Sequence, residues 1–270
     1  MIRLLALGLI VFIVIGCSSA PDKSYEVTTY KDISTKLMGF ADRKRQEAHY
    51  GDAIELYLEA EKYAIKRNDK YLLGLSQLKR SSIAIVQGRQ TEASLLLAEV
   101  ENMVRFEQVD LKLAIDFVKA KMAAAIGDTL TAKALFKGLE KYYSTDEQAF
   151  AQEKQIYYRL QGWSLDYQGL SAAQVEADIS TLRELYQAKQ LNNVEIFSFA
   201  LMSYLTWQVA NQSSTAPDIL TEALAHFATL ELSNKTAECY LLGAEYYQSQ
   251  GDKQKAEYYQ AQASKINLVL

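Results

Sequence analysis

Apolar and polar residues recur with a helical period along most of the chain, from Lys31 onward. Apolar residues return at spacings of three and four, and short polar stretches interrupt them, which is the pattern of amphipathic helices joined by tight turns. The pattern predicts an all-α domain over residues 31–267. It is expected to contain about six antiparallel helix pairs: 31–48 with 51–67, 70–87 with 90–105, 108–126 with 128–143, 146–168 with 171–190, 192–211 with 216–230, and 233–250 with 252–267.

Three segments repeat the same small and large residues at the same spacings around a glycine. The segments are Ser81, Ala84, Gly88, Ala93, Leu97 and Val100; then Ala120, Ala123, Gly127, Ala132, Phe136 and Leu139; then Ala244, Tyr247, Gly251, Ala256, Gln260 and Ala263. Two antiparallel helices meet closely where small residues face each other, and a glycine ends the first helix by taking a positive φ. The repeats therefore predict stacked helical hairpins.

These repeats resemble the tetratricopeptide repeat (TPR). The resemblance is carried by the Gly-Asp turns, by the small residue after each turn and by the large residue four positions later: Gly51-Asp52, Gly127-Asp128 and Gly251-Asp252; Ala53, Ala93, Ala132 and Ala256; Tyr57, Leu97 and Phe136. It implies a right-handed α-solenoid. The chain departs from the family in lacking the proline that ends each repeat, and in a shortened first turn between Gly51 and Ala53. Residues 145–230 keep the helical period without the signature.

The N-terminus has a different pattern. Arg3 supplies a positive charge, and Leu4 to Ile15 form an apolar run of 12 residues, which is shorter than the roughly 20 needed to span a bilayer. This is typical of a secretory signal. The sequence around Val14, Gly16 and Cys17 resembles the lipobox of bacterial lipoproteins.

The lipobox resemblance implies that residues 1–16 are removed and that Cys17 carries covalent lipid, the only non-protein group we expect. Residues 17–30, rich in Ser and Thr, then form a flexible tether, and residues 268–270 form an apolar tail. Ser18 after the cysteine resembles the outer-membrane type, so the protein would face the periplasm. An ordinary signal with an incidental cysteine and an uncleaved anchor remain alternatives.

Composition and charge narrow the function further. The chain has 2 prolines and 12 glycines among 270 residues, too few turn residues for an all-β fold. The net charge is −4 and no long basic run occurs, so a nucleic-acid partner is not expected. The densest basic cluster, Arg43-Lys44-Arg45, is interpreted as a solvated helix face. Cys239 is interpreted as a small core residue.

No catalytic motif or metal-binding spacing is found in the sequence. The only histidines, His49 and His226, are far apart, and each is interpreted as structural or solvated. The sequence therefore predicts a protein that is not an enzyme and that binds no metal. Carboxylate pairs can meet in space without any sequence signal, so an enzyme or binding protein acting on peptidoglycan or another glycan stays open as the alternative.

A candidate binding surface comes from residues four apart on one predicted helix, Arg159, Trp163 and Tyr167. In TPR-like solenoids the first helices of the pairs line the concave face, and aromatic and arginine side chains there are suited to grip a peptide. Core packing of Trp163 and Tyr167 is the alternative. Lys121 and Glu245 occupy analogous positions and are further candidates.

Together these features predict an outer-membrane lipoprotein that acts as a protein-binding scaffold or adaptor in envelope assembly. Its partner would be a protein or peptide of pilus, secretion, outer-membrane or cell-wall machinery. A lipoprotein that captures a small ligand in the concave groove is a further alternative. The sequence does not identify the partner.

Overall fold

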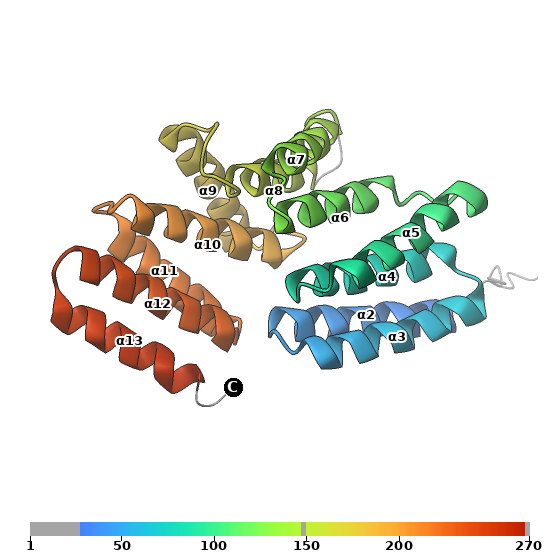
Figure 1. The fold of residues 1–270 in the computed structure, drawn as a ribbon, viewed down its shortest axis with the longest axis horizontal. Coiled ribbons are helices and arrows are strands. Elements are labelled where there is room, and N and C mark those ends of the chain that lie inside the picture. Colours follow the sequence, from blue (N-terminus) through green and yellow to red (C-terminus); the bar gives the residue numbers. More distant parts are fainter. Residues whose placement is uncertain (1–27, 147–149, 268–270) are drawn as a thin grey trace, which may run out of the picture.

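The computed structural model describes residues 28–146 and 150–267, which form twelve helices and no strand (Figure 1). The predicted signal segment, Cys17, nearly all of the tether and the tail at 268–270 lie outside the described residues. Among the helices of the described part, none is long and apolar enough to cross a membrane.

The helices follow one another with short connections. They are α2 (Thr29–Gln46), α3 (Tyr50–Arg67), α4 (Lys70–Val86), α5 (Gln90–Glu107), α6 (Lys112–Ala125), α7 (Thr129–Ser144), α8 (Ala151–Trp163), α9 (Ala172–Gln187), α10 (Val194–Ala210), α11 (Ala216–Thr229), α12 (Ser233–Ser249) and α13 (Lys253–Asn267). The predicted all-α fold of consecutive helix pairs is confirmed. The largest differences in bounds are in the middle, where α6 and α8 are shorter than the expected 108–126 and 146–168.

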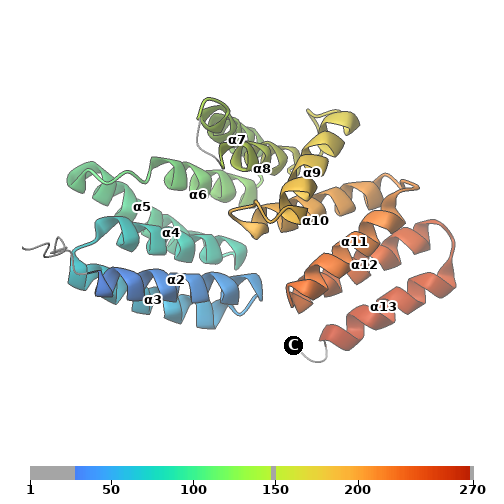
Figure 2. The ribbon, with the colours of Figure 1, turned by 180° about the vertical axis from the view of Figure 1, so that it is seen from behind.

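The stacked pairs curve so that the two ends of the solenoid face each other (Figures 1 and 2). We call α2–α5 the N-terminal arm, α6–α9 the bridge and α10–α13 the C-terminal arm. The regular pairing weakens inside the bridge: α8 packs along α7 and α9 packs along α10, while α8 and α9 have little contact with each other. The bridge is therefore where the chain turns from one arm to the other.

The turns predicted at Gly88, Gly127 and Gly251 are confirmed. All three glycines have positive φ, of 71°, 79° and 78°, a backbone conformation that favours glycine. Each turn has the same pair of backbone hydrogen bonds; for example, Gly127 N donates to Ala124 O at 3.0 Å and Asp128 N donates to Ala123 O at 2.9 Å. These bonds satisfy the last carbonyl groups of the first helix in each pair.

The prediction of a shortened first turn at Gly51 is wrong. Gly51 lies inside α3, and the left-handed residue is Ala48, with φ 62°. Ala48 N donates to Arg45 O at 3.1 Å and His49 N donates to Lys44 O at 2.9 Å. Ala48 therefore occupies the place that Gly88, Gly127 and Gly251 occupy in the other repeats, and the spacing from the turn to the buried alanine of the second helix is the same in all four.

Candidate binding cleft

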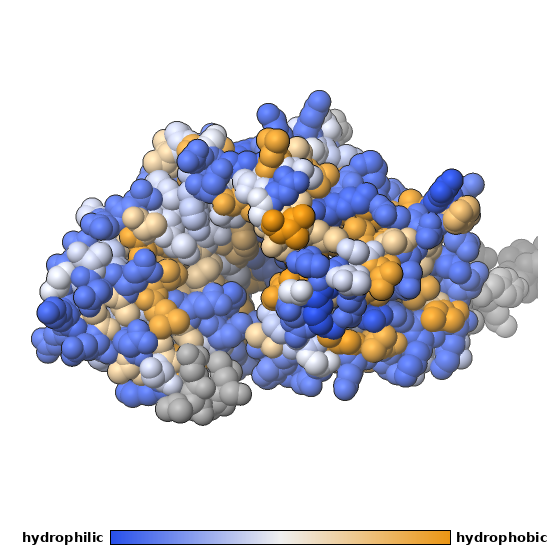
Figure 3. All heavy atoms as spheres, viewed as in Figure 1, coloured by the Kyte–Doolittle hydropathy of each residue, from blue (hydrophilic) through white to orange (hydrophobic). Residues whose placement is uncertain are grey.

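The concave side of the solenoid encloses a cleft between the two arms, which we call the central cleft. Its volume is about 620 Å³, within the roughly 300–1,000 Å³ typical of ligand sites. Side chains reach it from both arms and from the bridge, and the surface is visibly hollowed between the arms (Figure 3). The cleft exists because the chain curves, so its residues come from distant parts of the sequence.

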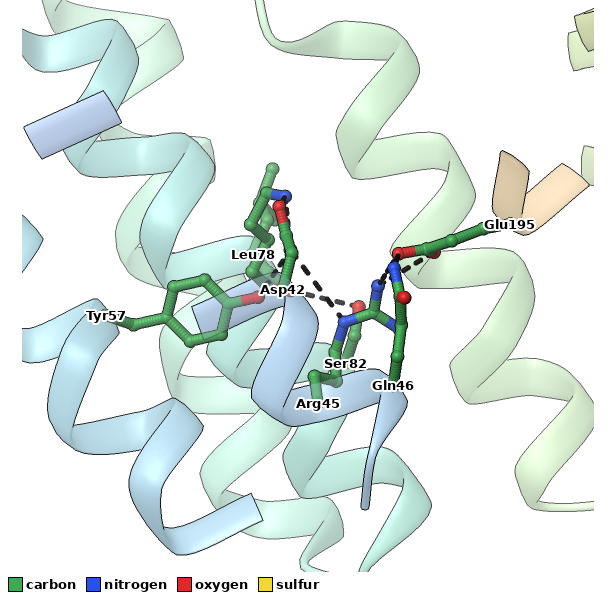
Figure 4. A network of polar contacts seen from close by, with 8 residues as sticks. Asp42, Arg45, Gln46, Tyr57, Leu78, Ser82 and Glu195 are labelled. Atoms are coloured by element: carbon green, nitrogen blue, oxygen red, sulfur yellow. Dashed lines mark hydrogen bonds and ion pairs between the residues drawn. The ribbon is translucent and has the colours of Figure 1, made fainter. Parts of the chain in front are cut away.

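The last turn of α2 closes one side of the central cleft against the C-terminal arm. Arg45 Nη2 donates to both carboxylate oxygens of Glu195 at 2.7 and 2.8 Å, and Gln46 Nε2 donates to the same carboxylate. Asn234 Nδ2 donates to the Gln46 carbonyl at 3.2 Å. We call Arg45, Gln46, Glu195 and Asn234 the clasp (Arg45, Gln46 and Glu195 are drawn in Figure 4).

Asp42 supports the clasp from one turn earlier on α2. Its carboxylate accepts hydrogen bonds from Tyr57 Oη at 2.6 Å and from Lys79 Nζ at 2.5 Å, and it lies 3.9 Å from Arg45 Nε (Figure 4). Burial opposes the charge on Arg45, but the Glu195 carboxylate raises the pKa of Arg45 above its ordinary value. The guanidinium therefore stays charged between two carboxylates.

Lys121 on α6 lines the cleft and has no hydrogen bond or ion pair to any residue that the structure describes. Its Nζ lies over the ring of Phe117, 5.5 Å from the centroid. Burial lowers the pKa of Lys121, the nearby Arg45 lowers it further, and Glu195 partly opposes both. Its enclosure without a counter-charge of its own therefore disfavours the charged form of Lys121, and an anion placed beside it would favour that form.

When Lys121 is protonated, the charges of the cleft leave one positive charge over. Its lining includes three cations, Arg45, Lys121 and Lys235, and two carboxylates, Glu195 and Glu238. Arg45 pairs with Glu195, and Lys235 Nζ pairs with Glu238 at 2.7 Å. The unmatched charge is that of Lys121. An anionic group placed beside it would restore neutrality.

The neutral part of the lining combines rings with hydrogen-bonding groups. Tyr157 and Phe199 line the cleft with their rings 5.5 Å apart, and the ring of Phe117, which is not part of the lining, lies 6.0 Å from that of Tyr157. Asn234 Oδ1 is buried and accepts no hydrogen bond from the described residues. The cleft therefore offers an apolar wall and the amino group of Lys121.

A serine and a histidine meet at the wall of the cleft. Ser198, which lines it, has its Oγ 2.8 Å from His226 Nε2. Burial lowers the pKa of His226 to about 4, which makes the imidazole a weak base, and its Nδ1 has no partner among the described residues. A base that activates a serine is normally oriented by a third group at that nitrogen. The pair fits a structural role better than a catalytic one.

The three residues of the predicted stripe, Arg159, Trp163 and Tyr167, do not share one surface in the structure. Arg159 is held between α7 and α9, with its Nε 2.8 Å from Glu140 and its Nη1 2.8 Å from Asp178. Trp163 is 2% exposed and belongs to the core of the C-terminal half. These two side chains are engaged inside the protein.

Tyr167 and Lys121 both line the central cleft, whereas Glu245 is exposed on α12 and does not. Tyr167 lies beyond the end of α8, in a turn with φ 57°, so it does not continue the helical stripe. Its ring lies 5.0 Å from that of Trp163 in an edge-to-face arrangement. Of the predicted candidates, the cleft brings together Lys121 and Tyr167.

The clasp residues were missed by sequence reasoning. Arg45 belongs to the basic cluster interpreted as a solvated face, yet it points into the cleft and pairs with Glu195, 150 residues later. Only Arg43 and Lys44 of that cluster fit the interpretation, because both remain substantially exposed. Nothing in the local pattern distinguishes Arg45 from its neighbours.

No protein-family model matches the chain, and no curated protein matches it either. Among the described residues, no group of three or more His, Cys, Asp or Glu side chains is arranged to hold a metal ion. The candidate function therefore rests on the central cleft and its residues.

Proposed function

We propose that this protein is a lipid-anchored adaptor of the bacterial envelope, whose central cleft holds a segment of a partner protein. The observation that carries the proposal is the cleft itself, which has side chains from both arms, an apolar wall and the unpaired Lys121. A concave, mostly preformed site with a few polar groups is the usual form of a binding site.

The proposed location rests on the sequence around Cys17. Its lipobox-like context supports lipidation, and Ser18 supports sorting to the outer membrane on the periplasmic side. Each buried methylene of an acyl chain contributes roughly 0.8 kcal/mol, so two or more chains anchor a protein stably. A Cys17→Ser variant should lose palmitate labelling and move to the soluble fraction. Labelling that persists would contradict the lipid anchor.

The adaptor role is tested by filling the cleft. Thr206 on α10 lines it, and a Thr206→Trp variant should abolish capture of the partner from detergent extracts. The matched control is Leu241→Trp, which adds the same ring at an exposed site on α12 outside the cleft. Thermal unfolding confirms that both variants fold. Capture that is equal in both variants, or absent with the unmodified protein, would contradict the proposal.

Capture of a small molecule is the second candidate function. It is favoured by the volume of about 620 Å³, which suits a ligand of drug size, and by a lining that is not dominated by solvated lysine and glutamate. Small-molecule extraction of the purified protein, followed by mass spectrometry, tests it. A ligand recovered from the native protein and absent from Thr206→Trp would support this candidate.

A further inference from the structure

Every charged side chain that lines the central cleft has a partner of opposite charge, except Lys121. The guanidinium of Arg45 is bound by both oxygens of Glu195, and Lys235 is bound by Glu238. The ammonium of Lys121 has only the face of the Phe117 ring, with the centroid 5.5 Å away. An enclosed ammonium without hydrogen-bond acceptors is unfavourable, so a ligand that supplies them gains affinity.

We propose that the central cleft contains a subsite for a single carboxylate, with the Lys121 ammonium as its counter-charge, on a ligand whose remaining body is apolar. The inference rests on the proposed function in that the cleft is the binding site. The carboxylate can come from a residue of the partner protein or from a free organic acid, and the chemistry at Lys121 is the same.

The number of charges selects a monoanion. With Lys121 protonated, the lining has a surplus of one positive charge, because Arg45 and Lys235 are already neutralised by Glu195 and Glu238. A dianion such as a phosphate monoester would leave a negative charge beside these carboxylates in a partly enclosed site, which is unfavourable. A carboxylate matches the surplus.

The surroundings of Lys121 select an apolar body. Lys121 Nζ lies 5.5 Å from the centroid of the Phe117 ring, which lies 6.0 Å from the ring of Tyr157. Tyr157 and Phe199 line the cleft with their rings 5.5 Å apart. A ring or branched aliphatic group attached to the carboxylate would pack against these two rings.

The test compares a carboxylate with its neutral amide. Binding of 3-phenylpropionate and of 3-phenylpropanamide to the full protein is measured by calorimetry or ligand-observed NMR. The acid should bind about tenfold or more tightly than the amide, because a charge-assisted hydrogen bond replaces a neutral one. Equal binding of the two, or no binding of the acid at millimolar concentration, overturns the proposal.

Variants place the effect at Lys121. Lys121→Met should remove the preference for the acid, and Lys121→Arg should keep most of it. Lys119→Met, on the same helix and paired with Glu101 at 2.5 Å, is the matched control and should bind like the unmodified protein. Because Lys121→Met removes an unpaired enclosed charge, its melting temperature should not fall. A preference that survives Lys121→Met overturns the proposal.

A second pair of probes separates the two sources of carboxylate. N-acetylphenylalanine adds a peptide N–H and carbonyl to the phenylpropionate frame. If it binds more tightly than 3-phenylpropionate, the source is a peptide, and the reverse order indicates a free acid.

If the acid binds through Lys121 while Thr206→Trp leaves partner capture unchanged, the carboxylate subsite stands and the adaptor function fails. If acid and amide bind equally while Thr206→Trp abolishes capture, the adaptor function stands and the subsite fails.

Discussion

The two arms follow the same plan of helix pairs, but the pair of α2 and α3 in the N-terminal arm is packed with smaller side chains than the C-terminal arm. In the N-terminal arm, the fully buried positions of α2 and α3 are mostly alanine, as at Ala41, Ala53, Ala60 and Ala64. In the C-terminal arm, the corresponding interior is filled by large side chains, among them Phe197, Leu201, Leu205, Leu220 and Phe227.

The alanine-rich core lets helices approach until side chains bond directly to the neighbouring backbone. Ser34 Oγ on α2 donates to Ala60 O on α3 at 3.0 Å, and Ser76 Oγ on α4 donates to Tyr57 O at 3.1 Å. Both serines are fully buried. The C-terminal arm gains its stability instead from the apolar area of large residues. The comparison indicates that close packing limits how large the buried residues of α2 and α3 can be, whereas the C-terminal arm limits how small its buried residues can be.

The largest expected effect is from Leu205→Ala in the C-terminal arm. Leu205 is 0% exposed, so its truncation should lower the free energy of unfolding by about 2–5 kcal/mol through lost burial and a residual cavity. Denaturant unfolding measures the change. Leu130→Ala, at a residue that is 83% exposed, should change stability by less than about 0.5 kcal/mol. Equal losses in the two variants would contradict the assignment of the core.

A second effect of the large-residue core is a pH dependence from His226. The imidazole is packed among Tyr186, Phe197 and Phe227, and burial lowers its pKa to about 4 from an ordinary value of about 6.5. As the pH falls, the unfolded chain takes up the proton first. Stability should therefore be full above about pH 6.5 and fall by about 2–3 kcal/mol as the pH approaches 4.

The measurement is the unfolding free energy of the unmodified protein and of His226→Gln across this pH range. The difference between the two should shrink as the pH falls, because the variant lacks the titrating group. A difference that does not change with pH would show that the pKa of His226 is not lowered in the folded state. The carboxyl groups whose pKa values shift are common to both proteins and cancel in the comparison.

The N-terminal arm should be destabilised when a buried residue is enlarged rather than truncated. Ala60 is 0% exposed and its carbonyl accepts the bond from Ser34, so Ala60→Val adds volume where the helices are closest. We expect a loss of about 1–3 kcal/mol from overpacking and from the poorer helix propensity of valine. Ala261→Val, at an exposed position of α13, measures the propensity part alone. If both variants lose the same amount, close packing is not what limits residue size in this arm.

Most of the fold could be predicted from the sequence because helix pairs are local. The period of apolar residues locates the helices, and glycines with positive φ end the first helices at Gly88, Gly127 and Gly251. The first turn was misplaced because Ala48, which takes the same conformation, carries no such signal. The nearby Gly51 has the residue type expected of a turn, but it lies inside α3.

The candidate site could be predicted only in part, because it depends on the curvature of the whole solenoid. Lys121 was found from its position on a first helix, since that position repeats. Arg45 and Glu195 meet only because the arms face each other. The curvature that brings the arms together is the sum of small rotations between successive helix pairs, and no single residue indicates it in the sequence. Tyr167 reaches the cleft for a different reason from the predicted one, from a turn rather than from a helical stripe.

The smallest expected effect on stability concerns the contact between the arms. The side chains of Arg45 and Glu195 are 29% and 32% exposed, and pairs of this kind contribute less than about 1 kcal/mol. Arg45→Met should therefore leave the unfolding free energy nearly unchanged. α2 packs along α3 and α4 and along no helix of the C-terminal arm, so polar contacts join the arms here. Besides the pair of Arg45 and Glu195 they are Gln46 with Glu195, Asn234 with the Gln46 carbonyl, and the exposed pair of Arg43 and Glu231. Losing Arg45, which bonds both oxygens of Glu195, should loosen this contact and let the arms move apart.

Small-angle X-ray scattering detects that separation as a larger radius of gyration. The matched control is Arg183→Met, which breaks the equally exposed pair of Arg183 and Glu222 between α9 and α11, away from the contact between the arms. The two variants should lose similar stability, but only Arg45→Met should expand the molecule. If both have the radius of the unmodified protein, packing within the bridge sets the spacing of the arms. The central cleft would then keep its width without the clasp.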